Sequence, residues 1–212
     1  MPKPEQITTA LLRERLADTR LPVDPLDVVM PPGSGRWPDD LRAALTESLK
    51  PAGVLIPIID RDDSLSVLLT KRSAALKHHA SQIAFPGGRM EAHDVDIQAT
   101  ALRETHEEVG FEPDSVTVIG YLEPMPTVTG YAVTPVIGIV ASPESLKVDR
   151  TEVELAFEVP LEFLLDKRNA RPGEREFRGH TIPIVEFQFE EHRIWGATAH
   201  MLIEFRKKYY KQ

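Results

Sequence analysis

Cysteine is absent from the 212-residue chain. The protein therefore has no disulfides, no thiolate zinc site and no cysteine nucleophile, and its metal-ligating side chains are His, Asp and Glu. Basic residues are also few, because 25 Lys and Arg stand against 33 Asp and Glu, for a formal net charge of −8. This balance disfavours a broad basic face, so we expect no nucleic-acid partner, while small anionic ligands remain compatible if cations neutralise them.

Long apolar runs are also missing. No segment has the length of a membrane span, and the first twenty residues lack the apolar stretch of a signal peptide. The same twenty residues carry acids, which transit peptides avoid. We expect a soluble, cytoplasmic protein with no membrane partner, and the length suits one large domain or one domain with an extension.

The first fifty residues predict a helical extension. Apolar side chains recur near helical spacing in residues 5–18 and 39–49, and the Pro- and Gly-rich stretch 23–38 between them predicts a loop. We therefore assign residues 1–50 to an N-terminal extension. Two hypotheses for its role are the covering of a sheet edge and a contact in a homodimer.

Residues 51–212 predict an α+β domain. Short apolar runs bounded by polar turns indicate strands, and longer runs with apolar residues at helical spacing indicate helices. The predicted strands are 53–60, 64–70, 115–122, 131–140, 154–160 and 181–189, and the predicted helices are 96–109 and 194–210. The expected fold is a mixed β-sheet flanked by helices.

The sequence RETHEEVG, residues 103–110, places three glutamates in the last turns of a predicted helix. Three glutamates in five residues usually form a solvated helix face. Here they stand near the helix C-terminus, where carboxylates are disfavoured, and each i,i+3 or i,i+4 pair costs about 0.2–0.5 kcal/mol. A divalent cation bound between Glu104, Glu107 and Glu108 would convert that repulsion into attraction. The PGG sequence before the helix supplies a backbone that a ligand can approach closely.

These residues resemble the Nudix box, G-x5-E-x7-R-E-U-x-E-E-x-G-U, where U is bulky and apolar. The second half matches at Arg103, Glu104, Glu107, Glu108, Gly110 and Phe111. Three features depart from the pattern. Asp94 replaces the first Glu, eight residues separate it from Arg103, and Thr105 takes the apolar position. We interpret this as a variant box in which Asp94 either serves the site or caps the helix.

Residues 68–88 resemble the signature of the coenzyme A pyrophosphatase branch of the Nudix family, L-L-T-x-R-[SA]-x3-R-x3-G-x3-F-P-G-G. The matching residues are Leu68, Leu69, Thr70, Arg72, Ser73, Phe85, Pro86, Gly87 and Gly88. Lys77 stands where the pattern has Arg, which loses the bidentate fork, and Ser81 stands where it has Gly. The resemblance covers roughly residues 53–205.

The resemblance implies a Nudix fold, an α/β/α sandwich, and hydrolysis of the diphosphate bond of coenzyme A or an acyl derivative to 3',5'-ADP and (acyl-)4'-phosphopantetheine. It implies Mg²⁺ or Mn²⁺ as cofactor, with Glu104 and Glu108 as direct ligands and Glu107 as a third or water-bridged one. Arg103 is expected to hold one of these carboxylates, and the Gly88 carbonyl to complete the metal shell. Glu152 and Glu154 are candidates for the general base.

The resemblance also implies a site for a small-molecule substrate. Arg72 and Lys77 are the expected phosphate contacts, and the other expected substrate-binding residues are Ser81, Phe85, Gly87 and Tyr131. Two alternatives stay open. One is a Nudix hydrolase of another nucleoside diphosphate derivative, such as ADP-ribose or a dinucleotide. The other is a protein that keeps the fold and binds nucleotides without turnover.

Overall fold

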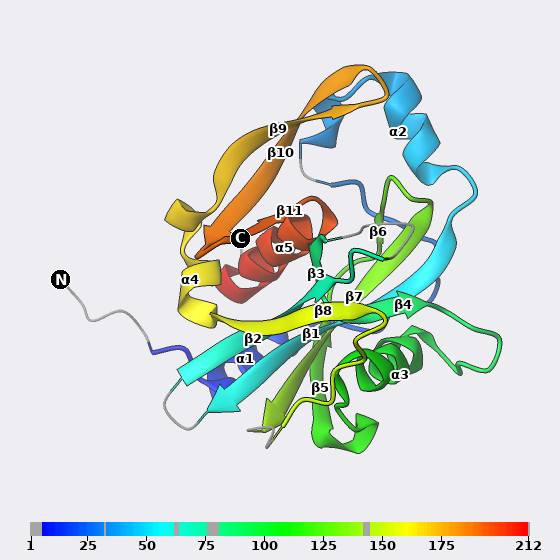
Figure 1. The fold of residues 1–212 in the computed structure, drawn as a ribbon. Coiled ribbons are helices and arrows are strands. Elements are labelled where there is room, and N and C mark those ends of the chain that lie inside the picture. Colours follow the sequence, from blue (N-terminus) through cyan, green and yellow to red (C-terminus); the bar gives the residue numbers. More distant parts are fainter. Residues whose placement is uncertain (1–5, 32, 62–63, 76–80, 142–144, 212) are drawn as a thin grey trace.

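The computed structural model describes residues 6–31, 33–61, 64–75, 81–141 and 145–211. Its centre is a mixed β-sheet whose strands follow the order β3-β2-β1-β7-β5 (Figure 1). β1 (Lys50–Arg61) and β7 (Tyr131–Ala141) pair in parallel, and β2 (Ser64–Arg72), β3 (Ile83–Ala84) and β5 (Val116–Tyr121) join antiparallel. Three further strands pair at the sides, namely β4 (Gly87–Arg89) on β1, β6 (Met125–Pro126) on β7 and β8 (Val153–Pro160) on β2.

Helices cover both faces of this sheet. On β1, Leu55 packs with Ala101 of α3 (Ile97–Val109), whereas the adjacent Ile56 belongs to the main core with α1 (Thr9–Leu16) and α5 (Ala197–Tyr210). Adjacent strand residues point to opposite faces, so these two contacts place the helices on opposite sides of the sheet. The predicted α+β fold with an α/β/α sandwich is therefore confirmed.

A second sheet of three antiparallel strands lies beside the first. It has the order β11-β10-β9, with β9 spanning Arg171–Phe177, β10 His180–Phe189 and β11 His192–Trp195. The sequence predicted β10 alone, because the alternating charges of β9 resemble a solvated loop. The remaining elements are α2 (Asp39–Thr46), α4 (Leu161–Leu165) and three 3₁₀ turns at Ser34–Arg36, Pro113–Ser115 and Lys167–Asn169.

The prediction of a closing helix over 194–210 was wrong at its start. Ile194 and Trp195 pair with β10, and the helix begins at Ala197. Gly196 separates the two elements with φ 67° and ψ −138°, a conformation that an α-helix cannot contain. Phe205 of this helix is fully buried in the main core, whereas Trp195 is a half-buried strand residue.

The N-terminal segment packs against the main sheet. α1 and α2 are each eight residues long, shorter than predicted, and Leu12 and Leu16 of α1 are buried in the main core. Thr19 accepts a hydrogen bond at 3.1 Å from the backbone N–H of Tyr121 on β5. Because β5 is the last strand of the main sheet order, this contact is the one that the edge-covering hypothesis predicts.

None of the helices in the described part of the chain combines the length and apolar character that a membrane crossing demands.

Candidate active site

Helix α3 carries the Nudix-box glutamates. Its N-cap is Asp96, whose side chain accepts from the Ala99 N–H at 2.7 Å, and it ends at Gly110, where φ is 81°. Thr105, which takes an apolar position of the pattern, is fully buried, and its hydroxyl donates to the Ala101 carbonyl at 2.6 Å. The internal hydrogen bond removes the main penalty for burying a hydroxyl there.

Asp94 is not the helix cap, and its contacts identify a different role. Its carboxylate accepts hydrogen bonds from Arg103 Nε at 2.9 Å and Nη2 at 3.0 Å, from Thr100 Oγ1 at 3.0 Å and from the Glu91 N–H at 2.9 Å. The Arg103 guanidinium holds the pKa of Asp94 far below its usual range. Asp94 therefore fixes Arg103, although eight residues separate the two where the pattern has seven.

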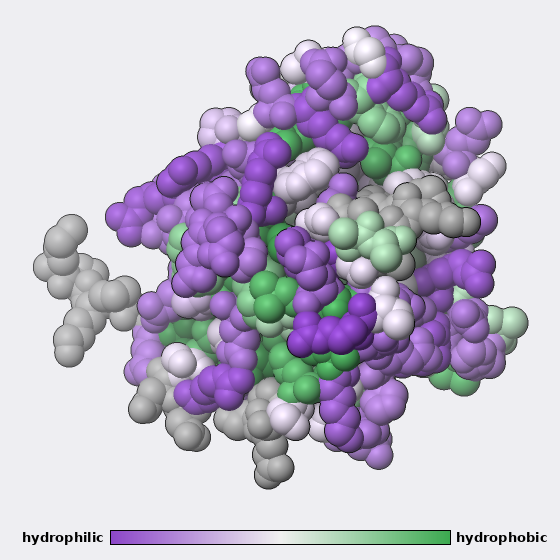
Figure 2. All heavy atoms as spheres, in the orientation of Figure 1, coloured by the Kyte–Doolittle hydropathy of each residue, from purple (hydrophilic) through white to green (hydrophobic). Residues whose placement is uncertain are grey.

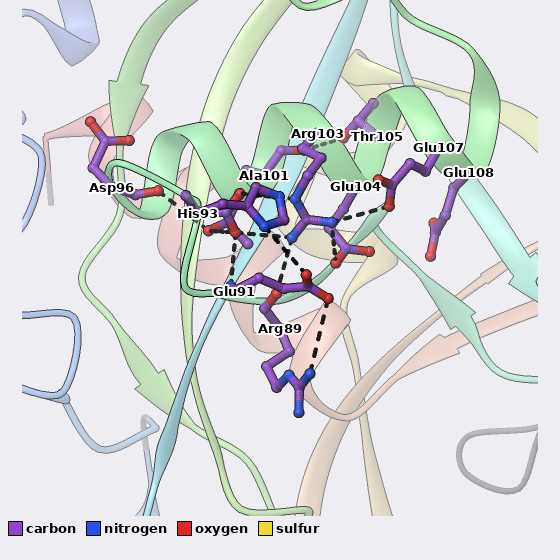
Figure 3. Close-up of polar contacts among 12 residues, drawn as sticks. Arg89, Glu91, His93, Asp96, Ala101, Arg103, Glu104, Thr105, Glu107 and Glu108 are labelled. Atoms are coloured by element: carbon purple, nitrogen blue, oxygen red, sulfur yellow. Dashed lines mark hydrogen bonds and ion pairs between the residues drawn. The ribbon is translucent and has the colours of Figure 1, made fainter.

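Arg103 in turn contacts two of the box glutamates. Its Nη1 donates to Glu104 Oε1 at 2.9 Å and to Glu107 Oε2 at 3.1 Å, and its Nη2 donates to the Arg89 carbonyl at 3.2 Å (Figure 3). One guanidinium thus joins the α3 face to β4. The predicted contact between Arg103 and box carboxylates is present.

Glu108 is the most buried of the three glutamates. Its side chain is 2% exposed, and Oε1 lies 3.3 Å from Arg72 Nη1 on β2. Oε2 is buried without a hydrogen-bond partner. Burial raises the pKa of Glu108 to about 8, against the lowering effect of Arg72. Burying a carboxylate oxygen without a partner is costly, and a bound cation would satisfy it.

Glu104 and Glu107 differ in their surroundings. Burial is the first cause that raises the pKa of Glu104, whereas the Glu107 side chain is 56% exposed. The backbone at Gly88 leaves space for the Glu104 carboxylate, because a Cβ added at Gly88 would lie 2.4 Å from Glu104 Oε2. Gly87 has φ +152°, and a Cβ there would meet the Gly53 carbonyl oxygen at 2.4 Å. The glycine pair therefore allows β4, β1 and Glu104 to approach closely.

Mg²⁺ or Mn²⁺ suits this donor set. The available ligands are all oxygens, Glu108 Oε2 has no partner, and Glu104 lies against the glycine pair. Glu104 and Glu108, with Glu107, are the residues that would hold such ions. In the side-chain arrangement of the described residues, however, no three His, Asp or Glu side chains group closely enough to hold a metal ion. In Figure 3 the carboxylates of Glu104 and Glu107 face Arg103, and that of Glu108 lies apart from them.

The two candidates for the general base occupy different environments. Glu154 forms an ion pair with Lys71 Nζ at 2.6 Å. Glu152 lies in the segment before β8, and the Ser73 N–H donates to its carbonyl at 2.7 Å. Burial is the largest cause that raises the pKa of Glu104 and of Glu108, and the negative charge of Glu152 is a smaller cause in both. Of these two, Glu152 is therefore the one near the box carboxylates.

The expected substrate-binding residues surround one cavity of about 760 Å³. Arg72, Phe85, Gly87 and Tyr131 line it, together with Gly88. Phe85 is also buried in the main core, and Tyr131 packs against that core from the start of β7. Gly88 therefore both lines the cavity and lies against the Glu104 carboxylate.

Of the other two expected substrate contacts, the structure describes Ser81. Ser81 is exposed, does not line the cavity and has φ 60°, a left-handed conformation that favours glycine. The positive φ at this position therefore explains why the branch signature has Gly here. Lys77 lies outside the described residues.

Sequence reasoning missed several residues of this region. The network of Asp94 with Thr100 and Glu91 could not be read from spacing alone, and Arg89 and Arg175 also line the cavity. The Asp at position 94, in place of Glu, was the available signal for the Arg103 contact.

Comparison with known proteins assigns the family. The NUDIX domain family matches residues 49–199. A protein from Enterobacter sp. strain 638 named uncharacterized Nudix hydrolase NudL is 39% identical over 153 residues, 72% of this chain and 79% of the relative. A protein of the same name from Shigella boydii serotype 4 is 42% identical over the same shares.

Among solved structures, a MutT/nudix family protein from Enterococcus faecalis superimposes with a TM-score of 0.51 at 15% identity, covering 78% of this chain and 64% of the other. This similarity supports the fold alone. Nudix hydrolases generally use divalent metal ions such as Mg²⁺ or Mn²⁺, in keeping with the oxygen ligands of α3. The family match, the two relatives and the box on α3 agree, and the chain belongs to the Nudix hydrolase family.

Proposed function

We propose that this Nudix hydrolase cleaves the diphosphate bond of coenzyme A or its acyl derivatives, giving 3',5'-ADP and (acyl-)4'-phosphopantetheine. The observation that carries the proposal is the contact between Arg72 and Glu108. Arg72 belongs to the coenzyme A branch signature, Glu108 belongs to the Nudix box, and the two are 3.3 Å apart beside the cavity. The signature thus lies next to the predicted metal ligands.

The residues of the chain have separate roles in the proposed reaction. Glu104, Glu107 and Glu108 would hold the divalent ions, and bound ions would neutralise phosphate charge and activate the attacking water. Arg103, fixed by Asp94, keeps Glu104 and Glu107 in place. Arg72 binds a phosphate oxygen of the substrate, and Glu152 accepts the proton of the water as it attacks phosphorus. The bond from that phosphorus to the bridging oxygen breaks, and the leaving phosphate takes the bridging oxygen.

The test is a substrate panel with the purified full-length protein. Coenzyme A, an acyl derivative, ADP-ribose and a dinucleoside polyphosphate are incubated with Mg²⁺ or Mn²⁺, and products are identified by mass spectrometry. We expect 3',5'-ADP from coenzyme A. Preferential cleavage of ADP-ribose or the dinucleotide would overturn the coenzyme A proposal in favour of a hydrolase of another nucleoside diphosphate derivative. The absence of product from every compound would favour a protein that binds nucleotides without turnover.

Glu108→Gln is the informative variant for this test. The amide keeps the shape of the side chain but cannot supply a carboxylate to the ions, so we expect kcat to fall by about 100-fold or more. We also expect the rise in Tm on adding Mn²⁺ to shrink, because binding to the native state is weakened. Glu112→Gln, at a 68% exposed position outside the site, is the matched control and should behave as wild type.

A further inference from the structure

The cavity is lined by the glycine pair and also by an apolar cluster. We name it the Trp37 cluster, and it consists of Trp37, Leu41, Leu45, Ile182 and Ile184, with Met30, Val128, Phe177 and Trp195 packed around them. Six of these residues line the cavity, namely Trp37, Leu45, Val128, Ile182, Ile184 and Trp195. Leu45 belongs to α2, Ile182 and Ile184 to β10, and Trp195 to β11. Trp37 precedes α2, and Val128 lies between β6 and β7. Figure 1 shows α2 beside the tip of the β9–β10 hairpin.

The size and lining of the cavity are those of a ligand site. Ligand sites have volumes of roughly 300–1,000 Å³, mainly apolar walls and a few polar groups. This cavity has a volume of about 760 Å³, is partly open to solvent and has walls that are mainly apolar.

The polar groups mark one end of the cavity as the reacting end. Arg72, Gly87 and Gly88 lie beside Glu104 and Glu108, where the substrate diphosphate is proposed to bind. Elsewhere on the wall, Arg175 lies over the Trp195 ring, with its guanidinium carbon 4.7 Å from the ring centroid. The side chains of the Trp37 cluster that line the cavity are apolar, and they suit an apolar chain as ligand.

Part of this wall lies outside the region shared with the family. The NUDIX domain match begins at residue 49, whereas Trp37 and Leu45 precede it. Trp37 is 8% exposed and Leu45 4% exposed, so both are held firmly in place. The N-terminal segment therefore contributes directly to the shape of the cavity beside the proposed reaction site.

We propose that the Trp37 cluster binds the acyl chain of an acyl thioester of coenzyme A, and that the N-terminal segment thereby sets the preference for the substrate. This inference rests on the proposed diphosphatase function, because it assigns the polar end to the diphosphate. It predicts that a medium-length acyl chain strengthens binding, since burying each methylene group removes apolar surface from water.

Binding without turnover is the first test, because it separates the cavity from the chemistry. The chain has two tryptophans, Trp37 and Trp195, and both line the cavity. Octanoyl-pantetheine, which contains no diphosphate, is titrated into the full-length protein in EDTA while tryptophan fluorescence is recorded. We expect a saturable change with octanoyl-pantetheine and none with pantetheine or 3',5'-ADP. A change with 3',5'-ADP alone, or with none of the three, would overturn the inference.

Turnover with matched variants is the second test. Val128→Phe adds bulk to the cavity wall, whereas Val23→Phe makes the same change at a fully exposed position. For wild type we expect kcat/KM for octanoyl-CoA to exceed that for coenzyme A by about tenfold or more. Val128→Phe should reduce this ratio to near one mainly through KM for octanoyl-CoA, and Val23→Phe should leave it unchanged. If Val128→Phe does not fold, Ala197→Leu adds bulk at another half-buried position of the wall.

The outcomes distinguish the two proposals. Equal kcat/KM for coenzyme A and octanoyl-CoA, or equal losses for both in Val128→Phe, would overturn the acyl-chain inference while leaving the diphosphatase proposal intact. Absence of hydrolysis of any coenzyme A compound would overturn the diphosphatase proposal. In that case the fluorescence titration alone decides whether the cavity binds an acyl chain.

Discussion

At the residue scale, single atoms decide whether the box carboxylates can work together. Gly88 has no side chain at the point where Glu104 approaches β4, and Arg103 is fixed from behind by Asp94. The contact of Gly88 with Glu104 and the contact of Arg103 with Asp94 each depend on both residues of the pair.

Gly88→Ala should reduce activity without unfolding the protein. The new methyl group would overlap the Glu104 carboxylate, and small displacements of catalytic groups cost about 100-fold in rate. We expect a loss of that order in kcat/KM with Mn²⁺, measured on the preferred diphosphate. Gly35→Ala is the matched control, because a Cβ at Gly35 meets nothing within 4 Å. Activity near wild type in Gly88→Ala would show that the position of Glu104 is not important.

Ser81→Gly should stabilise the protein. Ser81 has φ 60°, a conformation that costs an L-residue about 1–2 kcal/mol. Glycine removes this cost, but its greater freedom in the unfolded chain offsets part of the stabilisation. We expect a net increase of about 0.5–1 kcal/mol in the free energy of unfolding, measured by urea denaturation. Ser64→Gly, at an exposed strand position, should be neutral or destabilising. A loss of stability in Ser81→Gly would contradict the backbone explanation.

At the element scale, the long periodic segments were predicted well and the short ones were not. The strands 53–60, 64–70 and 131–140 and the helix 96–109 agree with β1, β2, β7 and α3 to within a few residues. Their apolar pattern is repeated over enough residues to fix the element type. β3, β4 and β6 have only two or three residues each and form because a neighbouring strand offers hydrogen bonds. Such elements have no local signal.

Helix α5 provides a prediction for pH dependence. His200 is buried in its first turns, and burial lowers the pKa of His200 below its ordinary value near 6.5. Above pH 6.5 the imidazole is neutral in both the folded and unfolded states. As the pH falls below 6.5 the unfolded state takes up the proton first, so the free energy of unfolding decreases, by at most about 1.4 kcal/mol per pH unit for one proton.

Urea denaturation at pH 7.5 and pH 5.5 checks this dependence. The loss of stability between the two pH values should be smaller in His200→Gln than in wild type, because the glutamine side chain does not take up a proton. His93→Gln, at a 66% exposed side chain, is the control and should keep the wild-type difference. An unchanged difference in His200→Gln would mean that another group causes the acid sensitivity.

At the scale of the whole molecule, the N-terminal segment and the Nudix domain share one core. Leu12 and Leu16 of α1 pack in the main core with strand residues and with α5, and the Trp37 cluster combines α2 with the second sheet. Figure 2 shows hydrophobic residues beside α2 and the tip of the β9–β10 hairpin, and a second group of them over the main sheet lower on the same face. The packing of α1 in the main core and of α2 on the second sheet both join residues that are distant in sequence.

Leu12→Ala should therefore destabilise the whole fold. The side chain is fully buried, and Leu→Ala changes at such sites cost about 2–5 kcal/mol. We expect a loss in this range in the free energy of unfolding, in a single transition that includes the Nudix domain. Leu26→Ala, at a 44% exposed position of the same segment, should change stability by about 0.5 kcal/mol or less. A Leu12→Ala protein as stable as wild type would show that α1 is dispensable for the core.

The sequence by itself determined the fold class, the main helices and strands, and the position of the three box glutamates on one helix. These follow from periodicity and spacing, which are local and repeat along the chain. The contact of Arg72 with Glu108, the fixing of Arg103 by Asp94 and the apolar cavity formed with Trp37 were decided only by the tertiary structure. Each of them joins side chains from different elements, and the distance between such side chains depends on how the elements pack.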